Sequence, residues 1–172
     1  MLFERYLLPD IMLPRYCDLT PEMLTARGIK GLICDIDNTL APYEDLDAPE
    51  GVIAWCTAME AAGVRVAFVS NNHAERVNRF NERIGVLTFP DSHKPGTDGI
   101  RRAMSAMGTD GTTTALIGDQ LLTDNCAAKR CGLYTVIVPP IRDKRTLFFR
   151  FKRWLEIPYV KKYKREKETD RQ

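Results

Sequence analysis

Several features that would define other protein classes are missing from this sequence. No run of about 18 apolar residues could form a membrane-spanning helix. Glu4 and Arg5 interrupt the N-terminal stretch MLFERYLLPDIML, where a secretory signal peptide would need continuous apolar residues. The five cysteines form no CxxC pair, and His73 and His93 have no zinc-ligand spacing to them. We therefore expect a cytoplasmic protein with reduced thiols.

The composition fits one folded domain with an unevenly charged chain. Its 172 residues, 44% of them hydrophobic, are enough for one sizeable core. From Arg142 onward, 12 Lys and Arg stand against 5 Asp and Glu, a net charge of +7, whereas residues 1–141 carry −5. We therefore divide the chain into a globular domain at 1–141 and a basic C-terminal helix and tail at 142–172.

Short apolar segments rich in branched residues alternate with segments of helical spacing. The apolar segments are GLIC (31–34), VRVAFV (64–69), VLTF (86–89), TALI (114–117) and YTVIV (134–138). Helical spacing occurs at 49–62, 74–84, 97–107 and 123–131, and Thr20 and Pro21 mark a further helix start. This alternation predicts an α/β fold, a doubly wound, Rossmann-like three-layer sandwich with a mainly parallel five-stranded sheet.

Polar residues follow each of the first four predicted strands. In chain order they are Asp35 and Asp37, Ser70 and Asn71, Lys94, and Asp119 and Asp124. Each alone would suit a turn or a helix cap, where Asp, Asn and Ser are common. Because the carboxyl ends of parallel strands meet at one crevice, we expect two acidic pairs, a hydroxyl and a lysine to lie together.

These residues occur in motifs that resemble those of a known superfamily. DIDNTL (35–40), Ser70 in VAFVSNN, Lys94 in HKPG and GDQLLTD (118–124) match in order the four motifs of the haloacid dehalogenase (HAD) phosphohydrolases, subfamily IIIA. The resemblance spans about residues 20–140, and the leader LLPDIMLPRYCDLTPEMLTARGIKG is similar to the YqeG-like branch. Some mitochondrial relatives of that branch dephosphorylate phosphatidylglycerophosphate. The resemblance therefore implies a phosphatase.

The resemblance also implies a Mg²⁺ site. Two carboxylates in one crevice repel each other unless a cation lies between them, and oxygen ligands without His or Cys suit Mg²⁺. The implied ligands are the Asp35 carboxylate, the Asp37 backbone carbonyl and Asp119. Asp124 would orient either a metal-bound water or Lys94.

The implied reaction divides the work among several side chains. Asp35 would be the nucleophile that forms an aspartyl phosphate, and Asp37 the general acid and base. The Ser70 hydroxyl, the Asn71 backbone N–H and Lys94 would bind the transferring phosphoryl group, where negative charge needs stabilising.

Two other classes have to be distinguished from a phosphatase. A receiver-like phosphoacceptor domain shares the sheet, the acidic residues, magnesium, a hydroxyl and a lysine, but no acidic pair follows its lysine. Here Asp119 and Asp124 follow Lys94, which disfavours a receiver. A non-catalytic binding module is disfavoured because every motif position holds a reactive residue type.

The motif spacing leaves no room for a cap domain. The intervals from Asp35 to Ser70 and from Ser70 to Lys94 are 35 and 24 residues, each largely consumed by one helix and one strand. An open site favours a phosphate on something large or surface-bound, such as a lipid phosphate, or a partner subunit that closes the site. The alternative is a broad phosphatase, or one acting on phosphoproteins or nucleotides.

The entrance of the site is expected to consist of a short flap at about residues 41–47. Tyr43 and Glu44 would shape it. His73 and Arg76, at the start of the next predicted helix, could reach a substrate, although a solvated helix face is the simpler interpretation of both.

The basic C-terminal segment has a helical pattern of its own. In KRTLFFRFKRWLE (144–156), one stripe contains Leu147, Phe148, Phe151, Trp154 and Leu155, with Lys152 and Arg153 away from it. The stripe could dock on the body and leave the basic face in solvent. Alternatively, the helix could lie on an anionic membrane, where each basic residue contributes about 1 kcal/mol. We favour peripheral contact with the inner membrane surface, although nucleic acid would be attracted by the same charge.

Overall fold

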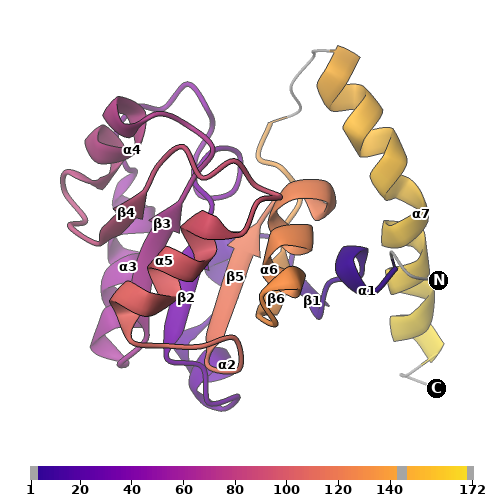
Figure 1. Cartoon of the computed structure of the whole chain (residues 1–172), viewed down its shortest axis with the longest axis horizontal. Coiled ribbons are helices and arrows are strands. Elements are labelled where there is room, and N and C mark those ends of the chain that lie inside the picture. The colour runs from indigo at the N-terminus through magenta and orange to yellow at the C-terminus, as the bar shows by residue number, and fades with distance from the viewer. Residues whose placement is uncertain (1–3, 143–146, 170–172) are drawn as a thin grey trace.

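The computed structural model describes residues 4–142 and 147–169, which form a three-layer α/β fold (Figure 1). The strands are β1 Ile11–Met12, β2 Gly31–Cys34, β3 Arg65–Val69, β4 Leu87–Phe89, β5 Thr114–Gly118 and β6 Tyr134–Ile137. The α-helices are α1 Glu4–Leu7, α2 Pro21–Thr25, α3 Glu50–Ala61, α4 Ala74–Asn81, α5 Asp98–Met107, α6 Cys126–Arg130 and α7 Leu147–Thr169. A 3-10 turn, η1 Tyr16–Asp18, and a turn of π-helix, η2 Leu121–Asn125, complete the elements.

The strands form one parallel sheet in the order β1-β6-β5-β2-β3-β4. The central strand β2 pairs with β3 on one side and β5 on the other, so that Cys34 lies opposite both Phe68 and Ile117. The chain winds outward from β2 to β4 and then returns to the other side of β2 with β5. Ligands of open parallel sheets bind at such a switch point, outside the carboxyl ends of the strands.

The predicted doubly wound fold is confirmed, with one correction to the strand count, and residues 4–142 and 147–169 form no cap domain. The five predicted strands agree with the structure within one residue at each end. The sixth, β1, pairs with β6 through only two residues, Ile11 opposite Val136 and Met12 opposite Ile137. Two residues are too few for a periodic pattern, which explains why the sequence did not indicate this strand.

Alternate residues of the central strands face the two helical layers. Leu32 and Cys34 of β2 belong to a core that includes Trp55 and Met59 of α3. Ile33 belongs to the opposite core, which is formed with α5 and α6. Because both faces of the sheet are covered, the strands are mostly apolar, as parallel strands usually are (Figure 1).

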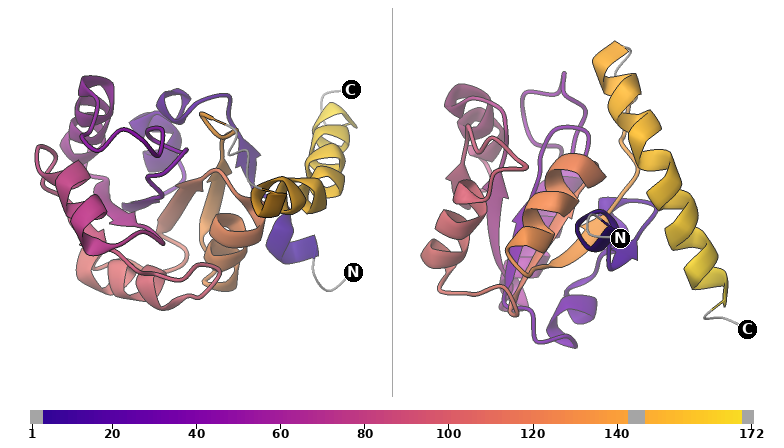
Figure 2. Two further views of the ribbon diagram at one scale, coloured as in Figure 1. Left: turned by 90° about the horizontal axis from the view of Figure 1, so that it is seen from above. Right: turned by 45° about the vertical axis from the view of Figure 1, so that its right-hand side comes forward.

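The helix α7 packs beside α1 and β1 at one edge of the molecule (Figure 2). Several polar contacts join it to the body. The Tyr163 hydroxyl accepts a hydrogen bond from the Met12 N–H at 2.9 Å, and Lys162 pairs with Glu4 at 3.0 Å. Glu156, only 3% exposed, accepts from the Leu122 N–H at 3.1 Å.

Docking through the apolar stripe of this helix is therefore wrong for the side chains that the structure describes. Phe151, Trp154 and Leu155 are 54%, 63% and 38% exposed. The side chains of Leu147 and Phe148 lie outside the described residues. Among the described residues, no helix combines the length and the apolar character that crossing a bilayer would require.

Candidate active site

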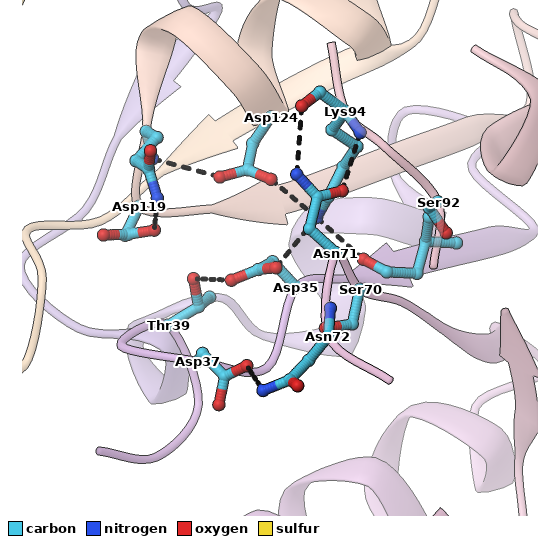
Figure 3. Close-up of polar contacts among 12 residues, drawn as sticks. Asp35, Asp37, Thr39, Ser70, Asn71, Asn72, Ser92, Lys94, Asp119 and Asp124 are labelled. Atoms are coloured by element: carbon cyan, nitrogen blue, oxygen red, sulfur yellow. Dashed lines mark hydrogen bonds and ion pairs between the residues drawn. The ribbon is translucent and has the colours of Figure 1, made fainter. Parts of the chain in front are cut away.

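The residues singled out from the sequence come together at the carboxyl ends of four adjacent strands (Figure 3). Asp35 directly follows β2, and Ser70 directly follows β3. Lys94 lies in the loop after β4, Asp119 follows β5, and Asp124 lies within η2. A turn of π-helix is uncommon and is often found at functional sites, in agreement with the position of Asp124 here.

Lys94 joins two of the acidic residues. Its Nζ lies 2.8 Å from Asp35 Oδ1 and 2.7 Å from Asp124 Oδ1, and it also donates to the Val69 carbonyl at 2.7 Å. Burial would lower the pKa of Lys94, but the charges of Asp124 and Asp35 outweigh burial and raise the pKa above its ordinary value. Lys94 is therefore a fixed cation between the two carboxylates.

Asp35 is held through both of its carboxylate oxygens. Lys94 contacts Oδ1, and the Thr39 hydroxyl donates to Oδ2 at 3.0 Å. Burial raises the pKa of Asp35 to about 6, with the charge of Asp124 adding to the rise and Lys94 opposing it. Thr39 belongs to the motif DIDNTL, so its place beside the proposed nucleophile gives that motif position a physical role.

Asp37 has a separate set of partners. The Asn72 side-chain amide donates to Oδ2 at 3.1 Å, and the Arg76 guanidinium contacts Oδ1 at 3.2 Å. Arg76 also donates to the Leu46 carbonyl at 3.0 Å, which links the flap to α4. The solvated interpretation of Arg76 is therefore wrong, because its side chain is buried between Asp37 and the flap.

Ser70 and Asn71 lie at the end of β3 and both line the pocket. The buried Ser70 Oγ accepts from the Asn72 N–H at 3.0 Å, which leaves the hydroxyl proton of Ser70 for another acceptor. The Asn71 side chain makes two hydrogen bonds with the Lys94 backbone: Nδ2 donates to the Lys94 carbonyl at 3.0 Å, and Oδ1 accepts from the Lys94 N–H at 2.6 Å. The Asn71 side chain thus fixes the backbone of Lys94.

Asp35, Asp119 and Asp124 form a buried acidic cluster. One carboxylate oxygen from each lies within 4.8 Å of the others. Burial, followed by the charges of Asp124 and Asp35, raises the pKa of Asp119 well above its ordinary value. The donors are hard oxygens whose mutual repulsion a divalent cation would relieve, so these residues fit a divalent metal of the Mg²⁺ type.

The C-terminal helix reaches this cluster, which the sequence did not lead us to expect. Arg153 of α7 contacts Asp119 Oδ2 at 2.5 Å and donates to the Asp119 carbonyl at 2.6 Å. Lys152, the neighbouring residue, lines the pocket. The predicted basic face of the helix therefore points toward the site instead of lying in solvent.

A pocket of about 270 Å³ is lined by Asp35, Asp124 and Lys94, whereas Asp119 is not part of its lining. It contains one side chain of the predicted flap, Tyr43, and two polar residues from the segment that follows β5, Gln120 and Thr123. Glu44 is not part of its lining, and His73 is exposed and pairs with Asp91 at 2.7 Å. The space is sufficient for a phosphate and part of its leaving group, but it would not enclose a large substrate.

Together with the sequence relatives described in the next paragraph, the fold and this site give the class: a HAD-type phosphatase, a phosphoric monoester hydrolase. A cobalt-bound deoxy-D-mannose-octulosonate 8-phosphate phosphatase from Haemophilus influenzae shares the fold, with a TM-score of 0.54 at 18% identity over 80% of this chain and 92% of that one. A Legionella pneumophila protein described as a HAD superfamily (subfamily III A) hydrolase matches with a TM-score of 0.52 at 22% identity, covering 69% and 71% of the two chains.

Sequence comparison identifies the family within this class. The family model described as mitochondrial PGP phosphatase matches residues 1–141, and the chain belongs to this family. Over 165 residues it is 33% identical to "Probable phosphatase YqeG" of Bacillus subtilis, with 96% of each sequence covered. It is also 27% identical to phosphatidylglycerophosphate phosphatase 1, chloroplastic, of Chlamydomonas reinhardtii, over 78% of this chain and 53% of that protein.

Proposed function

We propose that this chain is a Mg²⁺-dependent phosphomonoesterase that works through an aspartyl phosphate on Asp35. The observation that carries the proposal is the position of Asp35 between Lys94, at 2.8 Å, and the two other carboxylates of the acidic cluster. Magnesium would be held by the Asp35 carboxylate, the Asp37 backbone carbonyl and Asp119. When bound, it would neutralise charge on the transferring phosphoryl group.

In the first half of the reaction, a carboxylate oxygen of Asp35 attacks phosphorus and the phosphorus–oxygen bond to the leaving group breaks. Asp37 gives its proton to the leaving oxygen as that bond breaks, a contribution of roughly 10²- to 10⁴-fold in rate. The contacts of Asn72 and Arg76 with Asp37 hold its carboxyl group in one orientation.

In the second half, water attacks the phosphorus of the aspartyl phosphate. Asp37 takes a proton from this water, the bond between Asp35 and phosphorus breaks, and inorganic phosphate leaves. Ser70 and the Asn71 N–H would donate to the phosphoryl oxygens, and the positive charge of Lys94 would stabilise the negative charge that develops on Asp35 and on these oxygens. Asp124 holds Lys94 for this purpose through their 2.7 Å ion pair.

The test is hydrolysis of p-nitrophenyl phosphate with Mg²⁺ and with a chelator. We expect turnover that the chelator removes and that the Asp35→Asn variant lacks, while Asp18→Asn, a surface carboxylate paired with Arg15, keeps it. Retention of more than about a tenth of the activity by Asp35→Asn would contradict the nucleophile assignment. A receiver would be phosphorylated without sustained turnover, and a binding module would show neither.

We further propose that the natural substrate is a lipid phosphate monoester such as phosphatidylglycerophosphate. The family match supports this, as does the exposed apolar surface of α7 formed by Phe151, Trp154, Leu155 and Ile157, which we call the α7 apolar face. Phe151 and Trp154 stack on each other at a centroid distance of 6.0 Å. Aromatic and aliphatic side chains on a basic helix are typical of a helix lying in a membrane interface.

The geometry relates this face to the catalytic site. Lys152 lines the pocket, and it lies between Phe151 and Arg153 in the chain, so the membrane contact would be made close to the pocket. Residues 142–172 would then form the membrane-facing part of the protein, attached to the phosphatase domain at 1–141. The partner surface would be the anionic inner membrane, contacted peripherally.

A comparison of substrates tests the lipid proposal separately from the reaction. Phosphatidylglycerophosphate in vesicles should be hydrolysed with a kcat/KM at least about tenfold above those of nucleotide, sugar and protein phosphates, a difference of about 1.4 kcal/mol in transition-state free energy. Equal values across the panel would favour the broad phosphatase instead.

A further inference from the structure

We infer that Arg153 and Glu156 of α7 position the acidic residues after β5 for the metal ion, so that the C-terminal helix is a working part of the active site. We call this pair the α7 clamp. The inference rests on the proposed function, because it takes Asp119 to be a metal ligand. It goes beyond that function by assigning a role to a helix that lies outside the HAD motifs.

Arg153 fixes one residue in two ways. It contacts the Asp119 carboxylate at 2.5 Å and the Asp119 carbonyl at 2.6 Å, so that it holds the side chain and the backbone of the same residue. A guanidinium is a planar fork with fixed donor directions, which makes such a two-point contact more restrictive than a lysine contact would be. Asp119 is 1% exposed, and this cation is therefore part of its buried environment.

Glu156 holds the next part of the same segment. Its Oε1 accepts from the Leu122 N–H at 3.1 Å, and its Oε2 pairs with Arg153 at 2.9 Å. The first N–H groups of a helix have no partner inside the helix, so Glu156 supplies one at the start of η2. Because η2 carries Asp124, the clamp holds the segment that leads to Asp124 at two points, Asp119 and Leu122.

The contact leaves Asp119 able to bind a cation. Arg153 contacts Oδ2 and the backbone carbonyl, whereas Oδ1 accepts a long hydrogen bond of 3.5 Å from the Gln120 side chain. The acidic cluster takes one carboxylate oxygen from each of its residues. Groups that orient a metal ligand typically change metal affinity or activity by roughly 10- to 100-fold when they are removed. A competing role for Arg153, as a cation that displaces the metal, would give a change of the opposite sign.

The experiment measures the Mg²⁺ dissociation constant of the full-length protein by calorimetry. We expect Arg153→Gln to raise it roughly 10- to 100-fold and Arg153→Lys to raise it less, because a lysine keeps the charge but loses the two-point contact. At saturating Mg²⁺, the KM of Arg153→Gln for p-nitrophenyl phosphate should return to the wild-type value. A role in stability alone would leave the metal constant unchanged.

Two further variants make the result interpretable. Arg150→Gln also removes one positive charge from α7, but at an exposed position, and it should bind Mg²⁺ like the wild type. Glu156→Gln keeps an oxygen acceptor for Leu122 but loses the charge that pairs with Arg153. It should weaken Mg²⁺ binding several-fold even if Arg153→Gln does not fold.

The outcomes separate the clamp from the reaction. The clamp alone would be overturned if the wild type binds Mg²⁺, a folded Arg153→Gln variant binds it equally or more tightly, and Glu156→Gln has an unchanged Mg²⁺ dissociation constant. Wild-type protein that binds no Mg²⁺ and hydrolyses no phosphate ester would overturn the proposed function, and the clamp with it.

Discussion

Gly118 lies so close to Asp124 that a methyl group on residue 118 would fall 2.5 Å from Asp124 Cβ and 2.6 Å from its Cγ. In folded proteins, a Cβ atom essentially never lies this close to a carbon to which it is not bonded. A side chain at position 118 would thus prevent η2 from packing against β5. This packing brings Asp124 to Lys94, which explains the glycine at the end of the strand. In the motif GDQLLTD, the glycine is required for packing, and the two aspartates belong to the acidic cluster of the site.

Replacement of this glycine should damage the site. We expect Gly118→Ala to displace Asp124 from Lys94 and to lower kcat for p-nitrophenyl phosphate at least about tenfold, with a loss of stability of roughly 1–3 kcal/mol from overpacking. The control is Gly51→Ala in α3, where a methyl group would make only an ordinary 3.5 Å contact with Tyr16. It should gain about 0.4–1 kcal/mol and keep full activity. Full activity of Gly118→Ala would show that η2 can shift without consequence.

Asp37 and Asp119 should fail in different ways when each is changed to asparagine. Asp37→Asn should lower kcat by roughly 10²- to 10⁴-fold with Mg²⁺ affinity nearly intact, because the metal is expected at its backbone carbonyl. Asp119→Asn should weaken Mg²⁺ binding instead. In the wild type, Mg²⁺ at 100 times its dissociation constant should add about 2.7 kcal/mol to the free energy of unfolding. The same Mg²⁺ concentration should raise the melting temperature of Asp119→Asn much less. Equal losses of Mg²⁺ affinity in the two variants would contradict this division of roles.

Arg76 should matter for turnover although it lies outside the HAD motifs. Its contacts with Asp37 and with the Leu46 carbonyl are removed in Arg76→Met, which keeps most of the side-chain volume. We expect kcat to fall about tenfold with Mg²⁺ affinity unchanged, since a misplaced catalytic group can cost up to 10²-fold. Arg79→Met is the matched control, because Arg79 pairs with Asp47 at the surface, where such pairs contribute about 0–1 kcal/mol. A similar kcat in the two variants would remove the positioning role of Arg76.

The contacts of Arg76 and Arg153 show where inference from the sequence ends. The central strand and the residues that follow it were predictable, because GLIC is a buried run and the parallel topology brings the strand ends together. Arg76 and Arg153, by contrast, meet acidic partners 39 and 34 positions away. Nothing in the local pattern distinguishes them from arginines on a solvated helix face. Their burial depends on where complete helices dock, which is a tertiary property.

The orientation of α7 could not be predicted for a related reason. The periodicity identifies an apolar stripe and a basic face, and burial of the apolar stripe is the usual outcome. Here the body offers α7 a carboxylate, a backbone carbonyl and a backbone N–H, which arginine and glutamate satisfy. The polar face therefore docks, and the α7 apolar face is left exposed.

That exposed face provides the last prediction, which concerns membrane contact. We expect the protein to sediment with phosphatidylglycerol-rich vesicles at low salt and to do so less at high salt, because the basic residues near the lipid are screened. Phe151→Ser with Trp154→Ser should reduce this binding at least about tenfold, since the stacked pair is the most exposed apolar part of α7. Hydrolysis of p-nitrophenyl phosphate should persist.

The matched control for this double variant is Leu87→Ser. Leu87 is an apolar residue of similar exposure on β4, at the opposite edge of the sheet from α7, and its loss should leave vesicle binding unchanged. Deleting residues 142–172 would be a weaker experiment, because it removes Arg153 and Lys152 from the site together with the apolar face. Point substitutions separate the two functions of the helix. Equally negligible binding of the wild type to anionic and zwitterionic vesicles would exclude the membrane role of the α7 apolar face.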